Sequence, residues 1–136
     1  MAARFQLEIV TPEGRVYQRE VDMVVLPAAD GELGIYPQHA PLMTLLGSGE
    51  IIARRGAEED RILVTEGTAE VRADRVSVLT VFATNEAEVD EARAEEARRR
   101  AEERLKEKLS PEETALVQAS LAHSLAQIKV KRRRKS

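Results

Sequence analysis

Apolar and polar residues alternate along most of residues 5–82. Phe5, Leu7 and Ile9 alternate with Gln6 and Glu8, which is the period-two pattern of a half-buried strand. Turn sequences rich in glycine, proline and acidic residues interrupt the pattern at 11–14, 30–31, 47–49, 56–60 and 73–74. Roughly eight to ten short strands at this spacing predict an antiparallel β-sandwich or barrel with an aliphatic core.

The pattern changes near Thr84, where helix-forming residues replace the alternation. Residues 86–109 contain no glycine or proline and consist mainly of Ala, Glu, Arg, Lys and Leu, which are strong helix formers. They predict one helix, with Asn85 as its N-cap and Glu88 as the residue that completes the cap. Favourable pairs four residues apart are expected at Glu95–Arg99, Glu96–Arg100 and Glu102–Lys106.

A second helix is predicted to start at Ser110. Ser110 is expected as the N-cap, Pro111 as the first helical residue and Glu113 as the residue that closes a capping box. This helix should run to about Val130, and the near absence of a loop predicts an antiparallel hairpin. The predicted fold class is therefore α+β, with an N-terminal antiparallel β-sandwich over residues 1–84 and a C-terminal two-helix antiparallel hairpin with a basic tail over residues 85–136.

The apolar seam expected between the two helices is thin. It consists of Val89, Ala94, Ala97, Ala101, Leu105 and Leu109 on the first helix, and Ala115, Ala119, Leu121, Ala122, Leu125, Ala126 and Ile128 on the second. Alanine buries little area, and each Å² of apolar surface contributes only about 25 cal/mol. We expect two helices that are stable locally but weakly closed, which suits a conformational switch. A rigid helical appendage is the alternative.

Composition narrows the range of possible functions. The 136 residues include no cysteine and no tryptophan, with two phenylalanines and two tyrosines. Disulfides and thiolate metal sites are therefore impossible, and an aromatic platform for single-stranded nucleic acid is not expected. Neither a signal peptide nor an apolar run long enough to span a bilayer is expected, so any membrane association should depend on a partner.

Charge is distributed unevenly along the chain. The net charge is −3, although the C-terminal tail is strongly basic. The tail carries Lys129, Lys131, Arg132, Arg133, Arg134 and Lys135. A basic end on an acidic body predicts an acidic partner for the tail. Nucleic acid remains an alternative partner, and a salt-dependent shift with DNA would support it, but residues 1–84 contain no basic or aromatic stretch that would extend such a surface.

The most distinctive stretch runs from Asp30 to Leu42. It contains Gly31-Glu32-Leu33-Gly34-Ile35 and then Pro37-Gln38-His39-Ala40-Pro41-Leu42. Asp30-Gly31 predicts a turn, and the two prolines should exclude the residues between them from a sheet, so that His39 projects on a loop. On local chemistry alone this is a β-corner with a solvated histidine. The stretch also resembles the signature of the epsilon subunit of bacterial F-type ATP synthases, which corresponds to delta in mitochondria.

The resemblance covers both halves of the chain in the same order and implies a specific role. It implies a flattened β-sandwich that connects the gamma subunit to the c-subunit ring, with Glu32 and His39 contacting the polar loops of that ring. The helical hairpin would open to inhibit ATP hydrolysis, its tail reaching the alpha and beta subunits through Arg132, Arg133, Arg134 and Lys135. The chain would be a non-catalytic rotor subunit, needing no cofactor, peripheral at the cytoplasmic face of the bacterial cell membrane within the complex.

Residues 89–94 are similar to the nucleotide-binding motif of that family. The resemblance assigns weak regulatory ATP binding to Val89, Asp90 and Arg93, with Arg100 as a further phosphate contact. Asp90 and Arg93 lie three residues apart and would share a helix face, where an ordinary intrahelical pair is the alternative. The motif begins with Val instead of Ile or Leu, and Thr84, His123 and Gln127 stand where strong binders carry an acid and two arginines. An ATP-sensing module acting through the hairpin is the second functional hypothesis.

No arrangement of residues in the sequence supports catalysis or a metal site. His39 and His123 lie in different halves with no nucleophile pattern beside them. Phosphate-binding loops, dinucleotide-binding glycine turns and metal-spaced clusters are not found. We therefore expect a structural and regulatory protein, not an enzyme.

Overall fold

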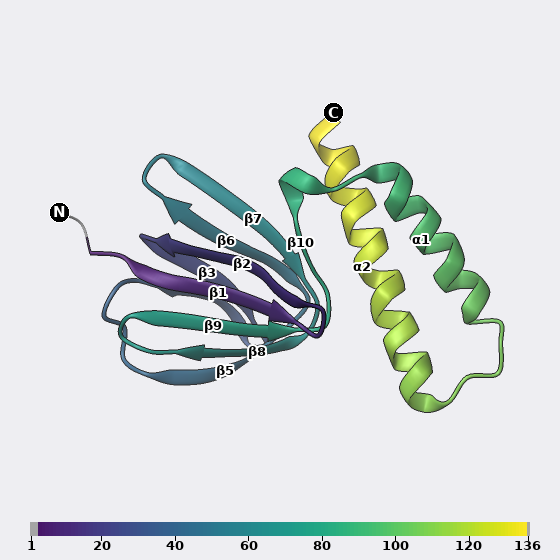
Figure 1. The fold of residues 1–136 in the computed structure, drawn as a ribbon, viewed down its shortest axis with the longest axis horizontal. Coiled ribbons are helices and arrows are strands. Elements are labelled where there is room, and N and C mark those ends of the chain that lie inside the picture. The colour runs from purple at the N-terminus through teal and green to yellow at the C-terminus, as the bar shows by residue number, and fades with distance from the viewer. Residues whose placement is uncertain (1–2, 136) are drawn as a thin grey trace. The chain divides into compact units, whose positions relative to one another are not determined.

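The computed structural model describes residues 3–135, and the side chains of all of these except Arg134 and Lys135. The chain forms two compact units, Met1–Ala87 and Glu88–Ser136, the first built of strands and the second of two helices (Figure 1). The strands are β1 (Phe5–Thr11), β2 (Gly14–Val21), β3 (Met23–Ala28), β4 (Gly31–Ile35), β5 (Leu42–Leu46), β6 (Gly49–Arg55), β7 (Glu58–Val64), β8 (Gly67–Val71), β9 (Arg75–Thr80) and β10 (Ala83–Asn85).

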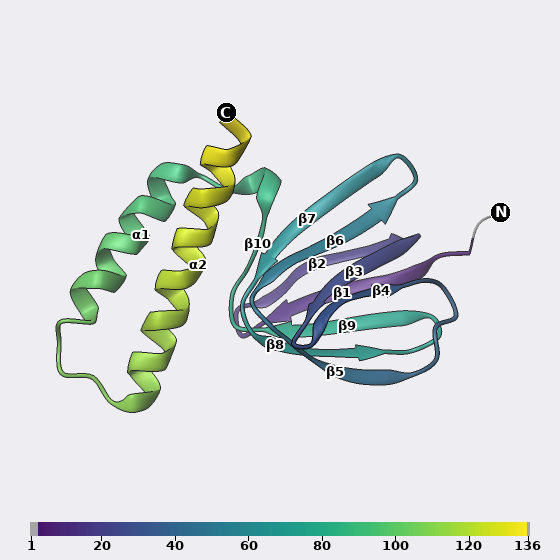
Figure 2. The ribbon, with the colours of Figure 1, turned by 180° about the vertical axis from the view of Figure 1, so that it is seen from behind.

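The strands form a sandwich in which β3 belongs to both layers. The hydrogen-bonded order is β10-β7-β6-β3-β5-β8-β9-β1-β2, and β4 pairs with β3 beside this path. The first half of β3 pairs with β6, whereas Ala28 at its end pairs with Leu46 of β5, so the sheet folds over at β3 (Figure 2). The predicted α+β fold with an N-terminal sandwich is confirmed.

One strand pair departs from the antiparallel pattern. β1 and β9 are parallel, with Leu7 opposite Val76 and Ile9 opposite Val78, whereas the other pairs are antiparallel. Alternation specifies which face a residue occupies and carries no information on strand direction, so this pairing could not be predicted from the pattern.

The core of the sandwich is aliphatic, as predicted. The β1 strand alternates buried and half-buried residues along its whole length, so its period-two pattern is realised in the fold. The largest fully buried side chains are Leu7, Ile9, Leu26, Ile35, Ile51, Ile62, Val21, Val24, Val71, Val76 and Val78. Burial of each contributes about 1.5–3 kcal/mol relative to an exposed position, which makes this half a rigid platform for its surface residues.

The first helix starts later and ends earlier than predicted. It spans Glu91–Arg104 as α1, with Asp90 as N-cap, so the prediction of a helix over 86–109 capped by Asn85 is wrong. Asn85 belongs to β10, opposite Ile62 of β7, and its Oδ1 accepts from the Ala87 amide at 3.0 Å. A short 3₁₀ turn over Glu86–Glu88 follows. Asn85 and Asp90 are both suitable N-cap residues. Because Asn85 pairs with β7, α1 starts after Asp90 instead.

The second helix begins as predicted. It spans Pro111–Lys135 as α2, and the Ser110 capping box is confirmed. The Glu113 amide donates to Ser110 Oγ and the Ser110 amide donates to the Glu113 carboxylate, each at 3.1 Å. The two helices pack as an antiparallel pair (Figure 1), joined by residues 105–110, a longer connection than expected.

The ion pairs of α1 follow a different spacing from the predicted one. Glu96–Arg100 is present at 3.8 Å. The other two predicted pairs are wrong, because Glu95 and Glu102 both pair with Arg98, at 2.9 and 2.7 Å. Arg98 lies three residues after one acid and four before the other, which are both favourable helical spacings.

The expected seam on α2 is partly wrong. Ala115, Ala122 and Leu125 are exposed, with Leu125 at 48%. Val117, Ser124 and Ile128 are buried and Leu121 is half-buried, a stripe at intervals of three and four residues. Ser124 stands in its middle, so a polar side chain lies among the buried residues of α2.

Candidate functional site

The signature stretch forms β4 and the loop that follows it. Glu32 lies opposite Pro27 next to the 29–30 turn, whereas Ile35 lies opposite Val24 and leads away to His39. The Gln38 amide donates to the Ala73 carbonyl at 2.9 Å, in the turn between β8 and β9. Glu32 and His39 are therefore not brought together: they flank opposite ends of β4, which at about 3.4 Å per residue separates them by roughly 10 Å or more.

The His39 loop has a defined local geometry. Gln38 adopts a φ of 63°, a conformation that L-residues seldom take. His39 is half-buried, and its Nδ1 lies 2.7 Å from the Ala40 carbonyl oxygen. A carbonyl oxygen only accepts, so Nδ1 is the donor in this contact and Nε2 is left to face a partner.

The outward side of β5, β8, β9 and β1 is unusually apolar. Met43, Leu45 and Leu79 are 73%, 65% and 57% exposed. Leu45 lies opposite Thr68, Thr68 opposite Leu79, and Leu79 opposite Val10, so these residues form one band across four strands. We call Val10, Met43, Leu45 and Leu79 the apolar face.

An open groove lies at the Val10 and Leu79 end of the apolar face. It is lined by Val10, Thr11, Pro12, Glu66, Gly67, Thr68, Leu79, Thr80 and Val81. A contiguous apolar surface of this kind marks an interaction site more often than chance exposure. The alternation did not predict this face, because 42–46 is apolar at almost every position. The sequence did carry one indication of this face. Alternate residues of a strand point to opposite faces, and 42–46 has apolar residues at both odd and even positions, so some of them must face outward.

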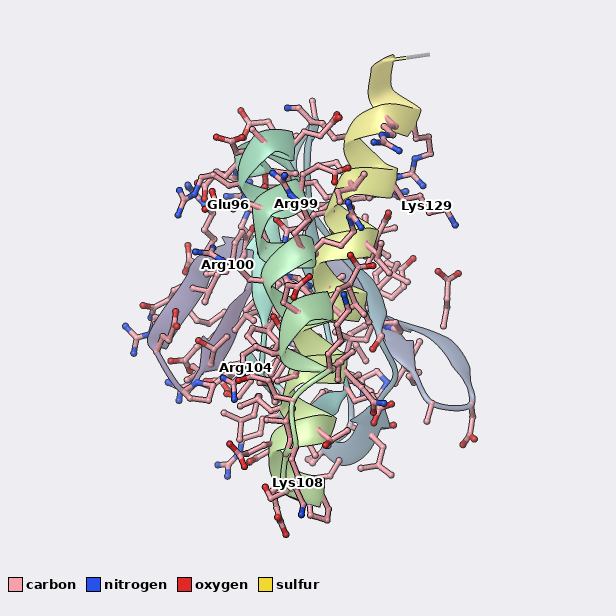
Figure 3. All side chains as sticks on the ribbon, turned by 90° about the vertical axis from the view of Figure 1, so that its right-hand side faces the viewer. Glu96, Arg99, Arg100, Arg104, Lys108 and Lys129 are labelled. Carbon is pink, nitrogen blue, oxygen red and sulfur yellow. The ribbon has the colours of Figure 1, made fainter. Side chains whose placement is uncertain are left out.

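The nucleotide motif opens α1 with most of its polar groups exposed. Val89 is buried, and Asp90 Oδ1 accepts from the Arg93 amide at 3.2 Å, so this carboxylate serves first as a helix cap. Arg93 and Arg100 are exposed and two turns apart, which places them on one face about 10 Å from each other. Figure 3 shows Glu96, Arg100 and Arg104 following one another down one side of the helix, with Lys108 beyond its end.

Arg104 extends the basic stripe that Arg93 and Arg100 begin, and sequence reasoning missed it. Its guanidinium lies 3.6 Å from both the Glu107 and the Glu113 carboxylates, and Arg100 lies 3.8 Å from Glu96. Acids thus neutralise part of the stripe. Arg93 and Arg100 could hold phosphate groups, and Asp90 Oδ2 could accept from a base or ribose, which is a partial fit to a nucleotide.

The basic tail makes contact with α1. Arg132 Nη2 donates to Glu95 Oε1 at 3.0 Å, and its Nε lies 3.7 Å from Glu91 Oε2. Arg98, and then Arg132, hold the pKa of the Glu95 carboxyl below its usual value. Arg133 is exposed, and the side chains of Arg134 and Lys135 lie outside the described residues. These contacts join the two open ends of the hairpin.

Two further observations concern the described residues as a whole. Neither helix in that part of the chain is long and apolar enough to cross a membrane. Within the same residues, no three histidine, cysteine, aspartate or glutamate side chains are grouped to hold a metal ion.

Comparison with protein families gives two matches that together cover most of the chain. Residues 4–86 match the model of the ATP synthase delta/epsilon chain β-sandwich domain. Residues 87–132 match that of the ATP synthase delta/epsilon chain long α-helix domain.

Curated relatives match over nearly their full lengths. The ATP synthase epsilon chain of Dehalococcoides mccartyi is 45% identical over 134 residues, covering 98% of this chain and 96% of the relative. The ATP synthase epsilon chain of Desulforamulus reducens is 40% identical over 129 residues, covering 95% of this chain and 98% of that relative.

Solved structures share the fold. A chain in the cryo-EM structure of the Euglena gracilis mitochondrial ATP synthase, comprising OSCP, F1 and the c ring, matches with a TM-score of 0.61 at 20% identity, covering 88% of this chain and 76% of that one. A chain in the cryo-EM structure of the Tetrahymena thermophila mitochondrial ATP synthase central stalk and c ring matches with a TM-score of 0.53 at 13% identity. The match covers 64% of this chain and 70% of that one.

Proposed function

The chain belongs to the ATP synthase delta/epsilon chain family, and on that premise we propose that it is a rotor subunit that couples gamma to the c ring and restrains ATP hydrolysis. It is a component of the complex and not its catalytic subunit. In this proposal it works at the cytoplasmic face of the bacterial cell membrane, which it meets only through its partners, and it carries out no bond chemistry.

The apolar face is the observation that carries the coupling role. Met43 and Leu45 project from a rigid strand and are more than half exposed, and leaving such side chains in water forgoes about 1.5–3 kcal/mol each. A partner that covers this face recovers that free energy. The gamma subunit is the proposed partner, because a rotor subunit must hold the rotating axle over a stable, water-excluding contact.

Glu32 and His39 are the proposed contacts to the c ring. They lie at opposite ends of β4, so a single short loop would not reach both. A ring presents the same polar loop repeatedly, and neighbouring copies could meet the two residues separately. Glu32 supplies an exposed carboxylate acceptor, and His39 supplies Nε2.

The hairpin is the proposed brake on hydrolysis. The buried residues of α1 are the alanines Ala94 and Ala101, which bury little apolar area, so closure is weakly favourable. Arg132 adds exposed ion pairs to Glu95 and Glu91, which contribute about 0–1 kcal/mol each. When the hairpin opens, Arg132, Arg133, Arg134 and Lys135 would become available to an acidic segment of the alpha and beta subunits.

ATP sensing is the second candidate function. Arg93, Arg100 and Asp90 Oδ2 offer a partial fit to a nucleotide, but Asp90 Oδ1 is already engaged as the helix cap. His123 is buried and does not extend the basic stripe. Weak regulatory binding of ATP is therefore the form of this proposal, with the hairpin stabilised when ATP is bound.

Truncation of the hairpin tests the brake. ATP hydrolysis should be measured in the assembled complex with the full chain and with a chain lacking residues 110–136. The truncated complex should assemble normally and hydrolyse ATP faster. Unchanged hydrolysis in a fully assembled complex would contradict inhibition, and loss of assembly would place the coupling role in the helices and not in the sandwich.

A further inference from the structure

β4 is an edge strand that carries half of the signature. In the part of the chain that the structure describes, it pairs with β3 alone. Unpaired strand edges invite pairing with another chain, and proteins usually protect them with prolines, bulges or several charges. β4 has one charged residue, Glu32, and two glycines in five residues.

The register identifies the backbone groups that point away from β3. Glu32 lies opposite Pro27, which has no amide hydrogen and whose carbonyl accepts from the Gly47 amide at 2.8 Å. This pair is therefore of the non-hydrogen-bonded type. The two types alternate along an antiparallel ladder, so the Gly34 position opposite Val25 is also non-hydrogen-bonded. The amides and carbonyls of Glu32 and Gly34 thus face outward from the sheet edge.

Among the residues that the structure describes, none requires glycine at position 34. Its φ lies in a range open to any residue, and a Cβ added there would meet no atom within 4 Å. Glycine inside a strand costs about 0.5–1 kcal/mol relative to alanine. Such a glycine often marks the close approach of another backbone or ligand, and a neighbour of this kind at Gly34 would come from outside the described residues.

The edge adjoins the apolar face. Ala28 of β3 pairs with Gly31 of β4 and with Leu46 of β5, so β4 and β5 border the same side of the sandwich, one from each layer. A partner that covers Met43 and Leu45 on β5 is therefore well placed to reach β4. We propose that an extended segment of the gamma subunit adds to β4 as a further strand, bonding to the backbone of Glu32 and Gly34. This rests on the proposed docking of gamma on the apolar face.

The side chains of β4 define the chemistry of that segment. Asp30 and Glu32 are exposed acids, which favour a basic residue opposite Glu32, because opposite charges facing each other across strands are stabilising. The bare backbone of Gly34 favours a large apolar or aromatic side chain opposite it, which would cover the exposed backbone. The expected segment is thus short, extended and basic, with one bulky residue two positions from the basic one.

Amide exchange tests strand addition residue by residue. The full chain, labelled with ¹⁵N, is followed by NMR hydrogen exchange alone and saturated with gamma. The amides of Glu32 and Gly34 should exchange fast in the free chain and at least about tenfold more slowly in the complex. Those of Leu33 and Ile35, which bond to β3, should be slow in both.

This experiment separates failure of strand addition at β4 from failure of gamma docking on the apolar face. If amides near Met43 and Leu45 respond to gamma while those of Glu32 and Gly34 do not slow, strand addition is overturned and docking stands. Failure of gamma to bind at all would overturn both.

A substitution at position 34 provides a second test. Gly34→Val suits a strand and has room in the free chain, so the fold should be kept, but its side chain would obstruct the residue opposite. Affinity for gamma should fall at least about tenfold relative to Gln18→Val, a control on β2. Equal affinity of the two variants would count against the proposal.

Discussion

Tyr17 of β2 donates a hydrogen bond to Asp60 of β7 at 2.7 Å, across 43 residues of sequence. The same Asp60 oxygen, Oδ2, also lies 3.2 Å from Arg55 Nη2. β2 is the last strand of the hydrogen-bonded path and β7 lies near its beginning. This side-chain bond therefore closes the sandwich where no backbone ladder does, opposite the side bordered by β4 and β5.

Removing this hydroxyl should destabilise the sandwich. Tyr17→Phe leaves the ring in place, deletes a bond to a charged acceptor and should cost about 1–2 kcal/mol. Urea unfolding of the full chain should show a lower midpoint with an unchanged slope. Val16→Ala, a change at a neighbouring exposed residue, should have little effect. An unchanged midpoint for Tyr17→Phe would mean that the bond makes no net contribution.

The same bond predicts an alkaline dependence of stability. Burial, followed by the hydrogen bond to Asp60, raises the pKa of Tyr17 well above its ordinary value. Above pH of about 10 the unfolded chain releases the tyrosine proton whereas the folded chain retains it. Stability should therefore fall as pH rises beyond 10 and be retained below it. Tyr17→Phe should show a smaller fall over the same range, and an identical slope in both proteins would contradict this assignment.

Charges placed on the apolar face should strongly weaken docking of gamma. Met43→Glu or Leu45→Glu puts a carboxylate where apolar area is proposed to be buried, and affinity should drop by about a hundredfold or more. Both side chains are exposed, so the isolated chain should fold as before. Ala57→Glu, in the β6–β7 turn, is the matched control. Titration calorimetry with purified gamma separates the variants, and wild-type affinity in Met43→Glu would place the interface elsewhere.

The contact between Arg132 and Glu95 should shift the hairpin equilibrium modestly. Because both side chains are partly exposed, Arg132→Glu should disfavour closure by about 0.5–1 kcal/mol. Closure can be measured as the distance between two probes, one on each helix. The chain lacks cysteine, so cysteines introduced at Arg99 and Gln118 would be the only sites at which thiol-reactive probes attach. The double variant Arg132→Glu, Glu95→Arg should restore closure, and Lys129→Glu is the control. Additive effects of the two single changes would argue against a direct contact.

A structural feature could be predicted from the sequence where all of the residues that form it lie in one short segment. The Ser110 capping box uses only four consecutive residues and formed as expected. Asn85 and Asp90 are both suitable caps, and the choice between them depended on the pairing of Asn85 with Ile62, a contact between distant segments. The outward placement of Met43 likewise depended on which phase of an apolar run faces the core. The direction of a strand, and which of its two sets of side chains faces the core, depend on contacts between distant segments. Alternation alone does not encode them.

The two roles of Asp90 can be separated by substitution. Asp90→Asn keeps an N-cap acceptor while removing the charge, whereas Asp90→Ala removes both and should cost about 1 kcal/mol of α1 stability. If regulatory ATP binds through the basic stripe, Arg93→Ala should weaken it and Asp90→Asn should preserve the fold. Circular dichroism melts and ATP titration of the full chain measure the two effects. Unchanged ATP binding in Arg93→Ala would leave Asp90 as a helix cap alone.

His123 gives the hairpin an acid-sensitive element that a solvated residue at the same position would lack. The side chain is 8% exposed, and this burial lowers the pKa of its imidazole. Below pH of about 6.5 the unfolded chain takes up a proton that the folded chain resists. Stability should therefore be complete above that pH and fall as the solution is acidified, by at most about 1.4 kcal/mol per pH unit.

Urea unfolding followed by helical circular dichroism between pH 8 and 5.5 measures this dependence, since most carboxylates titrate below that range. His123→Gln keeps a neutral polar side chain of similar size and should flatten the curve, whereas His39→Gln, which changes a residue of the β-sandwich and none of the hairpin, is the matched histidine control. Parallel curves for the wild-type chain and His123→Gln would show that the imidazole remains neutral in the unfolded chain as well, or that it is protonated in both states. Either result would remove the histidine as the source of acid sensitivity, and the weak closure of the hairpin would then rest on the alanine packing of α1 and the contacts of Arg132.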